Sequence, residues 1–433
     1  MTTTSRRPTR RAMIKGAAAF AVAPWFIPSS VFGQAGRPAP SNRITMGIIG
    51  AGNMGMGNMG TFLGLNDVQV VAVCDVDASH REQARQRVNR HYGNEDCKAY
   101  HDFRELLERK DIDAVSIAVP DHWHAITSIA AAKAGKDIYG EKPLSHTLAE
   151  GRAMVQAVER YGRIWQTGSW QRSHGNFAQA VELVRNGRIG KVHTIEVGLP
   201  VDGTVFKNVP PRPTDPPANL DWERWLGPAP YAPYQPERVH FTWRWNLDYG
   251  GGSLMDWIGH HGDIAHWGMD WDRTGPVEVE GVGEYQTKGI YNTAGRYRAV
   301  CTYANGVKMI IGGNQPGIRN GTRWIGTDGW VHVDRGSIDA NPKSLLQEKI
   351  GPNEFNVYRS PGHHRNFIDC VKSRQPTLTP AETAHRAATP GHLAQIAMLL
   401  GRKIRFNPET EEIIGDETAS RMLGHAMRAP WML

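Results

Sequence analysis

The sequence of 433 residues has few cysteines and no long apolar run. Its four cysteines stand far apart in the chain: Cys74, Cys97, Cys301 and Cys370. Because no two of them have a short paired spacing, they do not indicate a disulfide framework, although a single surface disulfide stays open. No stretch reaches the ~18 uninterrupted apolar residues that a bilayer-spanning helix needs, so we expect no membrane span.

The chain also has little net charge after its first 35 residues. The formal net charge is +7, and the first 35 residues hold no acid and five cations: Arg6, Arg7, Arg10, Arg11 and Lys15. Subtracting these five from +7 leaves +2. A chain so close to neutrality has no electrostatic footprint for nucleic acid or for an anionic membrane surface. We therefore expect no nucleic-acid partner.

The first 35 residues predict a twin-arginine export signal. Arg10 and Arg11 precede an apolar run over residues 16–27, and small residues suited to cleavage follow near residues 31–35. The run is too short and too rich in alanine and glycine to cross a bilayer as a stable helix. We expect export by the twin-arginine machinery, which carries folded proteins, and hence a periplasmic or other extracytoplasmic location.

Residues 36–166 alternate apolar strands with helical stretches, which is the pattern of a parallel sheet covered by helices on both faces. Strands are expected at residues 43–49, 68–74, 114–119 and 136–140, with helices at residues 77–92, 103–108 and 125–134. The pattern predicts a doubly wound domain of the Rossmann type, so the fold class is α/β.

Residues 167–433 predict a second, α+β domain. After a helix at residues 177–186, alternating strands are expected at residues 191–198, 277–284, 297–303, 307–312 and 330–333. This pattern favours a large, open, mainly antiparallel sheet, followed by a C-terminal helix from residue 391. The proline-rich residues 209–236 are expected to form an extended excursion.

The first strand leads directly into the turn Gly50-Ala51-Gly52-Asn53-Met54-Gly55. A strand, this turn, a helix and a second strand ending at Asp75 follow in the order of a dinucleotide-binding unit. The glycines permit a tight turn and close approach of a pyrophosphate to the helix N-terminus. Asp75 stands where a ribose-binding acid belongs, which favours NAD because its charge would repel the phosphate of NADP. Residues 55–60 offer a second register, but the first abuts the strand.

Three further polar clusters follow predicted strands or glycine turns. They are Pro120-Asp121-His122-Trp123-His124, Gly140-Glu141-Lys142-Pro143, and the residues 250–263 with Asp256 and His260. Together with the glycine turn, these clusters resemble the Gfo/Idh/MocA oxidoreductases, the family of glucose-fructose oxidoreductase and inositol dehydrogenase. The resemblance covers almost the whole chain after the signal. It implies an NAD(P)-dependent enzyme that transfers hydride at a hydroxyl carbon of a sugar, glycoside or cyclitol, and it suggests a homodimer or homotetramer.

By this resemblance, Lys142, Asp256 and His260 match the family's active-site lysine, aspartate and histidine. Asp256 and His260 are four positions apart, so a helix would place them on one face. His260 can take the hydroxyl proton, Lys142 can hydrogen-bond the developing oxyanion, and Asp256 can orient the imidazole or bind a neighbouring hydroxyl. Pro120, His124 and Glu141 are expected beside the cofactor with Lys142, although His124 can instead cap the helix that follows.

Candidate substrate contacts come from aromatic and polar side chains, because aromatic faces stack on sugar rings while hydroxyl groups need donors and acceptors. These candidates are Gln171, Arg172, Trp243, Trp245 and His261. Adjacent histidines on a helix diverge by about 100°, so joint ligation by His260 and His261 is awkward and we expect no metal.

The cofactor is expected to be NAD, with NADP as the alternative. Free dinucleotide is scarce outside the cell, so an exported enzyme should hold its cofactor tightly and regenerate it in place. Two other functions stay open. One is a redox-neutral glycosidase that oxidises, eliminates and re-reduces its substrate, and the other is a non-catalytic sugar-binding protein with the same fold.

Overall fold

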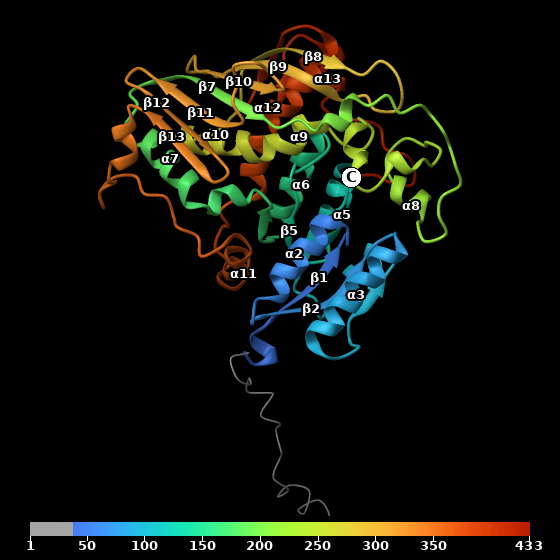
Figure 1. Ribbon diagram of the computed structural model, residues 1–433. Coiled ribbons are helices and arrows are strands. Elements are labelled where there is room, and N and C mark those ends of the chain that lie inside the picture. The colour runs from blue at the N-terminus through green and yellow to red at the C-terminus, as the bar shows by residue number, and fades with distance from the viewer. Residues whose placement is uncertain (1–37) are drawn as a thin grey trace, which may run out of the picture. The chain divides into compact units, whose positions relative to one another are not determined.

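The computed structural model describes residues 38–433. The export signal expected in residues 1–35 lies outside the described residues. A short 3-10 helix, η2 (Pro40–Asn42), precedes one compact unit of residues 44–433, which carries two sheets (Figure 1). Among the described residues, no helix combines the length and apolarity needed to cross a membrane. All four cysteines are buried and unpaired, so the surface disulfide left open by the sequence does not form.

The first sheet has six parallel strands in the order β3-β2-β1-β4-β5-β6. Its strands are β1 (Ile44–Ile49), β2 (Val68–Cys74), β3 (Lys98–Tyr100), β4 (Ala114–Ile117), β5 (Asp137–Gly140) and β6 (Trp165–Thr167). The connecting helices are α2 (Asn53–Leu63), α3 (Ala78–Tyr92), α4 (Phe103–Leu107), α5 (Asp121–Lys133) and α6 (Leu148–Arg160). The strand order reverses between β1 and β4, and this switch point is where such sheets bind nucleotides.

The second sheet has nine strands in the order β13-β12-β11-β7-β10-β9-β8-β14-β15. They are β7 (Val192–Leu199), β8 (Glu278–Tyr285), β9 (Ala294–Thr302), β10 (Lys308–Gly313), β11 (Gly321–Gly326), β12 (Trp330–Asp334), β13 (Ser337–Asn341), β14 (Ile404–Asn407) and β15 (Glu412–Ile413). Only the β7–β10 pair is parallel among these described strands. The predicted combination of a Rossmann sheet with a mainly antiparallel second sheet is therefore confirmed.

Helices pack on the inner face of this second sheet, where α7, α10 and α12 lie beneath the strands (Figure 1). The helices of this half are α7 (Gly175–Arg185), α8 (Trp222–Leu226), α9 (Gly252–Trp257), α10 (Asp263–Met269), α11 (His363–Ser373), α12 (Ala381–Leu400) and α13 (Glu417–Arg421). Short 3-10 turns are η3 (Trp170–Ser173), η4 (Gly203–Phe206), η5 (Pro236–Arg238), η6 (Thr242–Trp245) and η8 (Lys343–Gln347). The largest core joins these helices to the strands and includes Phe177, Leu254 and Trp324, each at most 2% exposed.

Two helix boundaries differ from the prediction for local reasons. The C-terminal helix α12 begins at Ala381, ten residues before the predicted start, because Pro390 is accommodated inside a helix that is buried for most of its length. Helix α5 begins at Asp121, not at residue 125, with Pro120 as its N-cap. The polar cluster after β4 therefore forms the first turn of a helix.

Candidate active site

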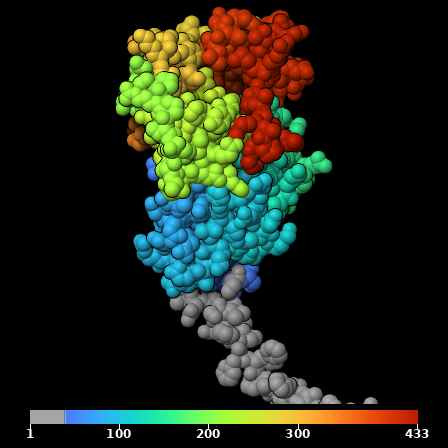
Figure 2. Space-filling view, turned by 90° about the vertical axis from the view of Figure 1, so that its right-hand side faces the viewer, coloured from blue at the N-terminus to red at the C-terminus, as the bar shows by residue number. Residues whose placement is uncertain are grey.

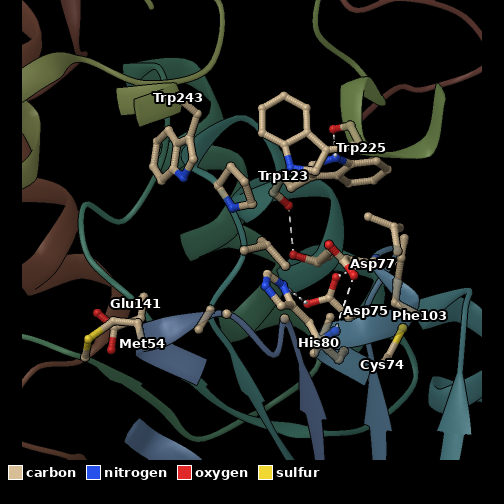
Figure 3. Close-up of a pocket in the computed structure, with 18 of the residues that line it drawn as sticks. Met54, Cys74, Asp75, Asp77, His80, Phe103, Trp123, Glu141, Trp225 and Trp243 are labelled. Carbon is tan, nitrogen blue, oxygen red and sulfur yellow. Dashed lines mark hydrogen bonds and ion pairs between the residues drawn. The ribbon is translucent and has the colours of Figure 1, made fainter. Parts of the chain in front are cut away.

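A cavity of about 570 Å³ lies at the carboxyl ends of the parallel strands (Figure 3). One wall comes from the segments that follow β1, β2, β4 and β5, and the volume is ordinary for a small-molecule site. The other wall comes from the proline-rich excursion, from the residues after it and from the C-terminal segment: Leu220, Arg224, Trp225, His240, Phe241, Trp243, Arg244 and Trp431. The excursion thus forms one side of a binding cavity.

The glycine turn between β1 and α2 requires residues without a side chain. Gly50 has a φ of +87°, and a β-carbon there would lie 2.4 Å from the carbonyl oxygen of Ala118. A β-carbon on Gly55 would lie 1.9 Å from the carbonyl oxygen of Gly50. Gly52 is the N-cap of α2, has no side-chain cap and faces open space. These contacts favour the first of the two glycine registers and turn the N-terminus of α2 towards the cavity, as an anion site requires.

Asp75 follows β2 and ties the glycine turn to that strand. Its Oδ2 accepts the N–H of Ala51 at 2.7 Å, and its Oδ1 accepts the N–H of Asp77 at 2.8 Å. Burial raises the pKa of Asp75, while these backbone hydrogen bonds act in the opposite direction. Asp77 caps α3 through bonds from Ser79 and His80 and also lines the cavity. Each carboxyl group keeps lone pairs that can accept the hydroxyl groups of a ribose.

Lys142 connects the cavity to the second half of the molecule. Its Nζ donates to Asp256 Oδ1 at 2.8 Å and to the Asp256 carbonyl oxygen at 2.9 Å. Arg244 Nε donates to the same Oδ1 at 3.2 Å, and its guanidinium lies 4.5 Å from the centre of the Trp243 ring. Burial raises the pKa of Asp256, but the charges of Lys142 and Arg244 outweigh it and bring the pKa to about 2. Asp256 is therefore an anion that holds Lys142 in place.

His260 lies in a π-helical turn, η7 (Ile258–Gly262), between α9 and α10. Asp256 lies in the last turn of α9, so the two residues expected to share one helix face stand on either side of the change from α-helix to π-helix. Asp256 binds Lys142 and Arg244 rather than orienting the imidazole. His260 is 5% exposed, and its Nδ1 has no hydrogen-bond partner within the described residues. Burial and then the charge of Lys142 lower its pKa well below the ordinary value, so the ring is neutral.

Two tryptophans and an arginine surround His260. The ring centres of Trp170 and Trp257 lie 6.0 and 5.6 Å from the centre of the imidazole. The guanidinium carbon of Arg335 lies 4.4 Å from the centre of the Trp170 ring and 4.5 Å from that of Trp257. Arg335 Nε donates to Gln171 Oε1 at 3.2 Å. Aromatic faces beside a guanidinium suit a polyhydroxylated ring or its anionic derivative.

The cavity brings together most of the residues expected to bind a cofactor: Gly50, Gly52, Asn53, Met54, Asp75, Pro120, His124, Glu141 and Lys142. Gly55 is not among them, since it packs behind the turn on Gly50. His124 braces two loops, because its Nδ1 lies 2.8 Å from the Pro143 carbonyl oxygen and its Nε2 lies 2.8 Å from that of Val119. Glu141 is buried and accepts Asn58 Nδ2 at 2.9 Å. Trp243 lines the cavity, and it is the only expected substrate contact that does so.

The structure contradicts the expected substrate roles of Arg172 and Trp245. Arg172 is 3% exposed, and its Nε and Nη2 donate to Asp263 Oδ2 at 2.8 Å and to Asp272 Oδ1 at 2.7 Å. Trp245 is 2% exposed and packs in a small core of its own. A guanidinium held by two carboxylates and an indole enclosed in a core have no surface left for a substrate.

Gln171 and His261 lie behind the site rather than in it. Both are fully buried, and Gln171 Nε2 lies 3.3 Å from His261 Nδ1. The His261 ring stacks on Trp257 with 5.6 Å between the ring centres and 7° between the planes. These two residues therefore position Arg335 and Trp257, which is a correction to their expected role as direct contacts.

The sequence reasoning did not single out Arg335 and gave no role in the site to Asp121, Trp257 and Trp431, whereas Trp170 and Arg244 stand in the two segments that it placed near the substrate. Arg244 stands between Trp243 and Trp245 in a segment already singled out, so the composition of that segment points to it. Arg335 and Trp431 give no local signal, because the turn after β12 and the C-terminal segment bring them to the site only in the folded chain.

The fold and the site together define a dinucleotide-binding α/β protein. The glycine turn that a β-carbon would fill, the N-terminus of α2 and the paired carboxyl groups of Asp75 and Asp77 all fit a nicotinamide dinucleotide. The chain belongs to the Gfo/Idh/MocA oxidoreductase family. The family model of the NAD-binding Rossmann fold matches residues 44–169, and that of the C-terminal alpha/beta domain matches residues 205–433.

Individual relatives match only part of the chain. A myo-inositol 2-dehydrogenase of Thermotoga maritima is 34% identical over 152 residues, which are 35% of this chain and 44% of that protein. Glycosyl hydrolase family 109 protein 2 of a Shewanella species is 32% identical over 122 residues, which are 27% of this chain and 26% of that protein. The chain thus spans less than half the length of these curated relatives.

The solved structures extend the similarity of fold. The aldose-aldose oxidoreductase of Caulobacter crescentus, complexed with glycerol, superposes with a TM-score of 0.62 over 84% of this chain and 100% of that one. The sequence identity is 19%, so this likeness concerns the fold alone.

Proposed function

We propose that the protein is an NAD-dependent oxidoreductase that acts on a hydroxyl carbon of a sugar, glycoside or cyclitol. The observation that carries this proposal is the position of Lys142. It lines the cavity that suits a dinucleotide, and its ammonium group is fixed by Asp256 in the cluster beside His260. Family membership and the partial match to an inositol dehydrogenase support the same class of reaction.

Lys142 and His260 have different roles in the proposed proton transfer. A bound nicotinamide would supply the hydride acceptor. An ammonium group has three donors, and Lys142 uses its contacts with Asp256 to aim the remaining proton at the oxygen of a substrate alcohol. The neutral His260 ring can accept the alcohol proton through Nε2, because Nδ1 is enclosed by the protein. Burial excludes water from this transfer.

Absorbance of the reduced nicotinamide tests the proposal. The purified protein, carrying its own nucleotide, is mixed with a panel of aldoses, uronates, glycosides and inositols. We expect reduction with at least one class, and the His260→Ala variant should keep the nucleotide but lose the reduction. A nucleotide that stays oxidised with the whole panel would support the non-catalytic sugar-binding alternative.

A second candidate is a redox-neutral glycosidase, favoured by the match to a family 109 glycosyl hydrolase. The same Lys142 and His260 would serve transient oxidation of a ring carbon. Release of a chromogenic aglycone without an added acceptor would rank this reaction first, whereas net reduction of the nucleotide by a free sugar would rank the dehydrogenase first.

The cofactor is proposed to be NAD rather than NADP, and to be retained. Asp75 and Asp77 place two carboxyl groups on the cavity wall, and a phosphate on the ribose would meet their charge. Mass spectrometry of the nucleotide released on denaturation tests both points. A retained cofactor also requires a second substrate to reset it, so initial-rate lines should run parallel.

We also propose that the protein is exported by the twin-arginine route to an extracytoplasmic location. We propose further that it assembles as a homodimer or homotetramer. The pair Arg10-Arg11 before an apolar run supports export, and the resemblance to the family supports assembly. Fractionation of cells expressing an Arg10→Lys, Arg11→Lys variant tests the first, and light scattering tests the second.

A further inference from the structure

We propose that His146, Glu150 and His425 form a binding site for a divalent transition-metal ion, with zinc as the best match. One potential ligand atom from each of the three residues lies within 4.8 Å of the others. None of the three lines the cavity, so this site is separate from the one proposed to hold the dinucleotide. Two imidazoles with one carboxylate are a ligand set that zinc uses in proteins, with a fourth position open to water.

Glu150 offers one oxygen that the fold leaves unused. Its side chain serves the N-terminus of α6 as a capping box, in which Oε2 accepts the N–H groups of His146 at 3.0 Å and Thr147 at 3.2 Å. The residue is 2% exposed, and Oε1 has no hydrogen-bond partner within the described residues. A buried oxygen without a partner is destabilising, and a cation would satisfy it.

His146 has the arrangement of a metal-binding histidine. Its Nε2 lies 2.8 Å from the carbonyl oxygen of Leu247, so Nε2 carries the proton and Nδ1 carries the free lone pair. Nδ1 is buried and has no hydrogen-bond partner among the described residues. Metal ligands of this type almost always donate their other ring N–H to a carbonyl or a carboxylate, which fixes the ring.

His425 completes the cluster from the C-terminal segment. Its Nε2 lies 3.6 Å from Glu150 Oε1, and its ring centre lies 5.1 Å from that of His146. Ligand atoms around a tetrahedral ion with bonds of about 2.0–2.1 Å are about 3.4 Å apart. The 3.6 Å pair nearly meets this spacing, and the other atoms, within 4.8 Å, would have to move closer on binding. A distance of 3.6 Å is too long for a hydrogen bond, so Glu150 Oε1 receives none from His425. Its side chain is 26% exposed, which gives an ion and a water access.

An ion at this position would fasten the C-terminal segment to the loop that follows Lys142. The Ala149 N–H already donates to the Leu423 carbonyl oxygen at 2.8 Å, just before His425. Beyond it the chain continues to Trp431, whose ring centre lies 4.7 Å from that of Trp123 at the cavity. Figure 2 shows this C-terminal part in red, lying against the teal surface of the Rossmann half.

The experiment uses the full chain without an affinity tag, stripped of metal with a chelator, and cobalt(II) as the probe. We expect one cobalt per chain, a visible ligand-field spectrum of low symmetry, and a thermal midpoint raised by about 5 °C at saturation. His425→Ala and Glu150→Gln should both abolish the spectrum. Glu150→Gln keeps an acceptor for the capping bonds, so it guards against simple misfolding.

Two controls locate the ion. His91→Ala removes an exposed histidine of α3 and should leave the titration unchanged. His80→Ala alters a second group of potential ligands, Asp77, His80 and His240, in the cavity. If His80→Ala abolishes the spectrum and His425→Ala does not, the proposal is overturned. A titration without stoichiometric binding overturns it as well.

Discussion

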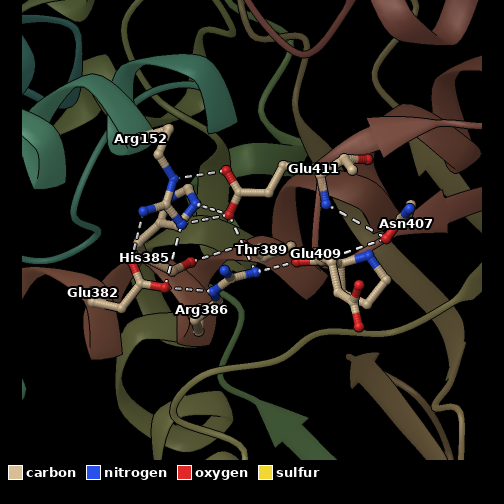
Figure 4. A network of polar contacts seen from close by, with 10 residues as sticks. Arg152, Glu382, His385, Arg386, Thr389, Asn407, Glu409 and Glu411 are labelled. Atoms are coloured by element: carbon tan, nitrogen blue, oxygen red, sulfur yellow. Dashed lines mark hydrogen bonds and ion pairs between the residues drawn. The ribbon is translucent and has the colours of Figure 1, made fainter.

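Two charged clusters join the Rossmann domain to the C-terminal domain, and they differ in how completely their polar atoms are satisfied. In the first, Lys142 binds Asp256 beside His260, whose Nδ1 has no partner within the described residues. The second contains Arg152 of α6, which donates to Glu382 at 2.6 Å and to Glu411 at 2.6 Å (Figure 4).

The second cluster is closed on itself. His385 Nε2 lies 2.7 Å from Glu411 Oε1, and Arg386 Nε donates to Glu382 at 2.7 Å. None of its five charged or imidazole side chains has a buried polar atom without a partner. The comparison teaches that a saturated network fixes the domains, whereas an unsaturated one keeps donors and acceptors for a reacting molecule.

The largest expected effect is on kcat, and it is seen by replacing one cation in each cluster with methionine. Lys142→Met should lower kcat by about 10²–10⁴-fold, because it removes the donor to the substrate oxygen. Arg152→Met should leave kcat nearly unchanged below its melting temperature, yet lower the free energy of unfolding by about 3 kcal/mol, since two buried carboxylates lose a partner. Steady-state kinetics and urea unfolding measure the two effects. Equal losses of kcat in both variants would break the distinction.

The next largest effect is expected on nucleotide affinity, which compares a glycine that lines the cavity with one that does not. Gly52 and Gly57 both have room for a β-carbon, but only Gly52 lines the cavity. Gly52→Ala should fold normally and lower the affinity for nucleotide by about tenfold, which is about 1.4 kcal/mol. Gly57→Ala is the control and should bind normally, with a slight gain in helix stability. Calorimetric titration of the stripped protein gives both affinities, and the reverse order would favour the second glycine register.

Acid should weaken the saturated cluster in a predictable direction. Burial raises the pKa of Glu411, but hydrogen bonds from Arg152 and His385 outweigh it and hold the pKa well below the ordinary value of 4.5. A lowered pKa in the folded state contributes stability above 4.5 that is lost as the pH falls below it. Urea unfolding between pH 6 and about pH 3 should therefore show falling stability, with a shallower fall in Arg152→Met.

The smallest effect is expected at the edge of the unsaturated region. Arg335 rests between Trp170 and Trp257, beside His260 and outside the lining of the cavity. Arg335→Gln should raise KM by about three- to tenfold with little change in kcat, because it removes binding that ground state and transition state share. The rise should be greater for a uronate than for a neutral sugar. A large loss of kcat would instead give Arg335 a part in the chemistry.

Strong local signals made the first sheet predictable. The apolar runs of β1 and β2 and the glycines between them are contiguous in sequence, so the dinucleotide unit was found with nearly correct boundaries. Strands β3 and β6 were missed because each has only three residues. Their pairing depends on neighbouring strands that a local pattern does not contain.

Residues of the candidate site could be predicted only where they stand in a recognisable sequence motif. Lys142 and His260 stand in distinctive segments, and the family resemblance gave both an expected role. Arg172 has the composition of a sugar contact, yet Asp263 and Asp272 enclose it, and no spacing reveals that pairing. The π-helical turn at His260 is likewise a property of the packed chain.

The cavity has one consequence for the order of folding. Gly50 and Trp431 both line it, so its two walls come from opposite ends of the described chain. Contacts so remote in sequence form late, after the intervening segments have been synthesised and packed. The cavity can therefore bind a nucleotide only after both walls have formed. If the enzyme leaves the cytoplasm already folded, as proposed above, a bound nucleotide would indicate that folding is complete before transport begins.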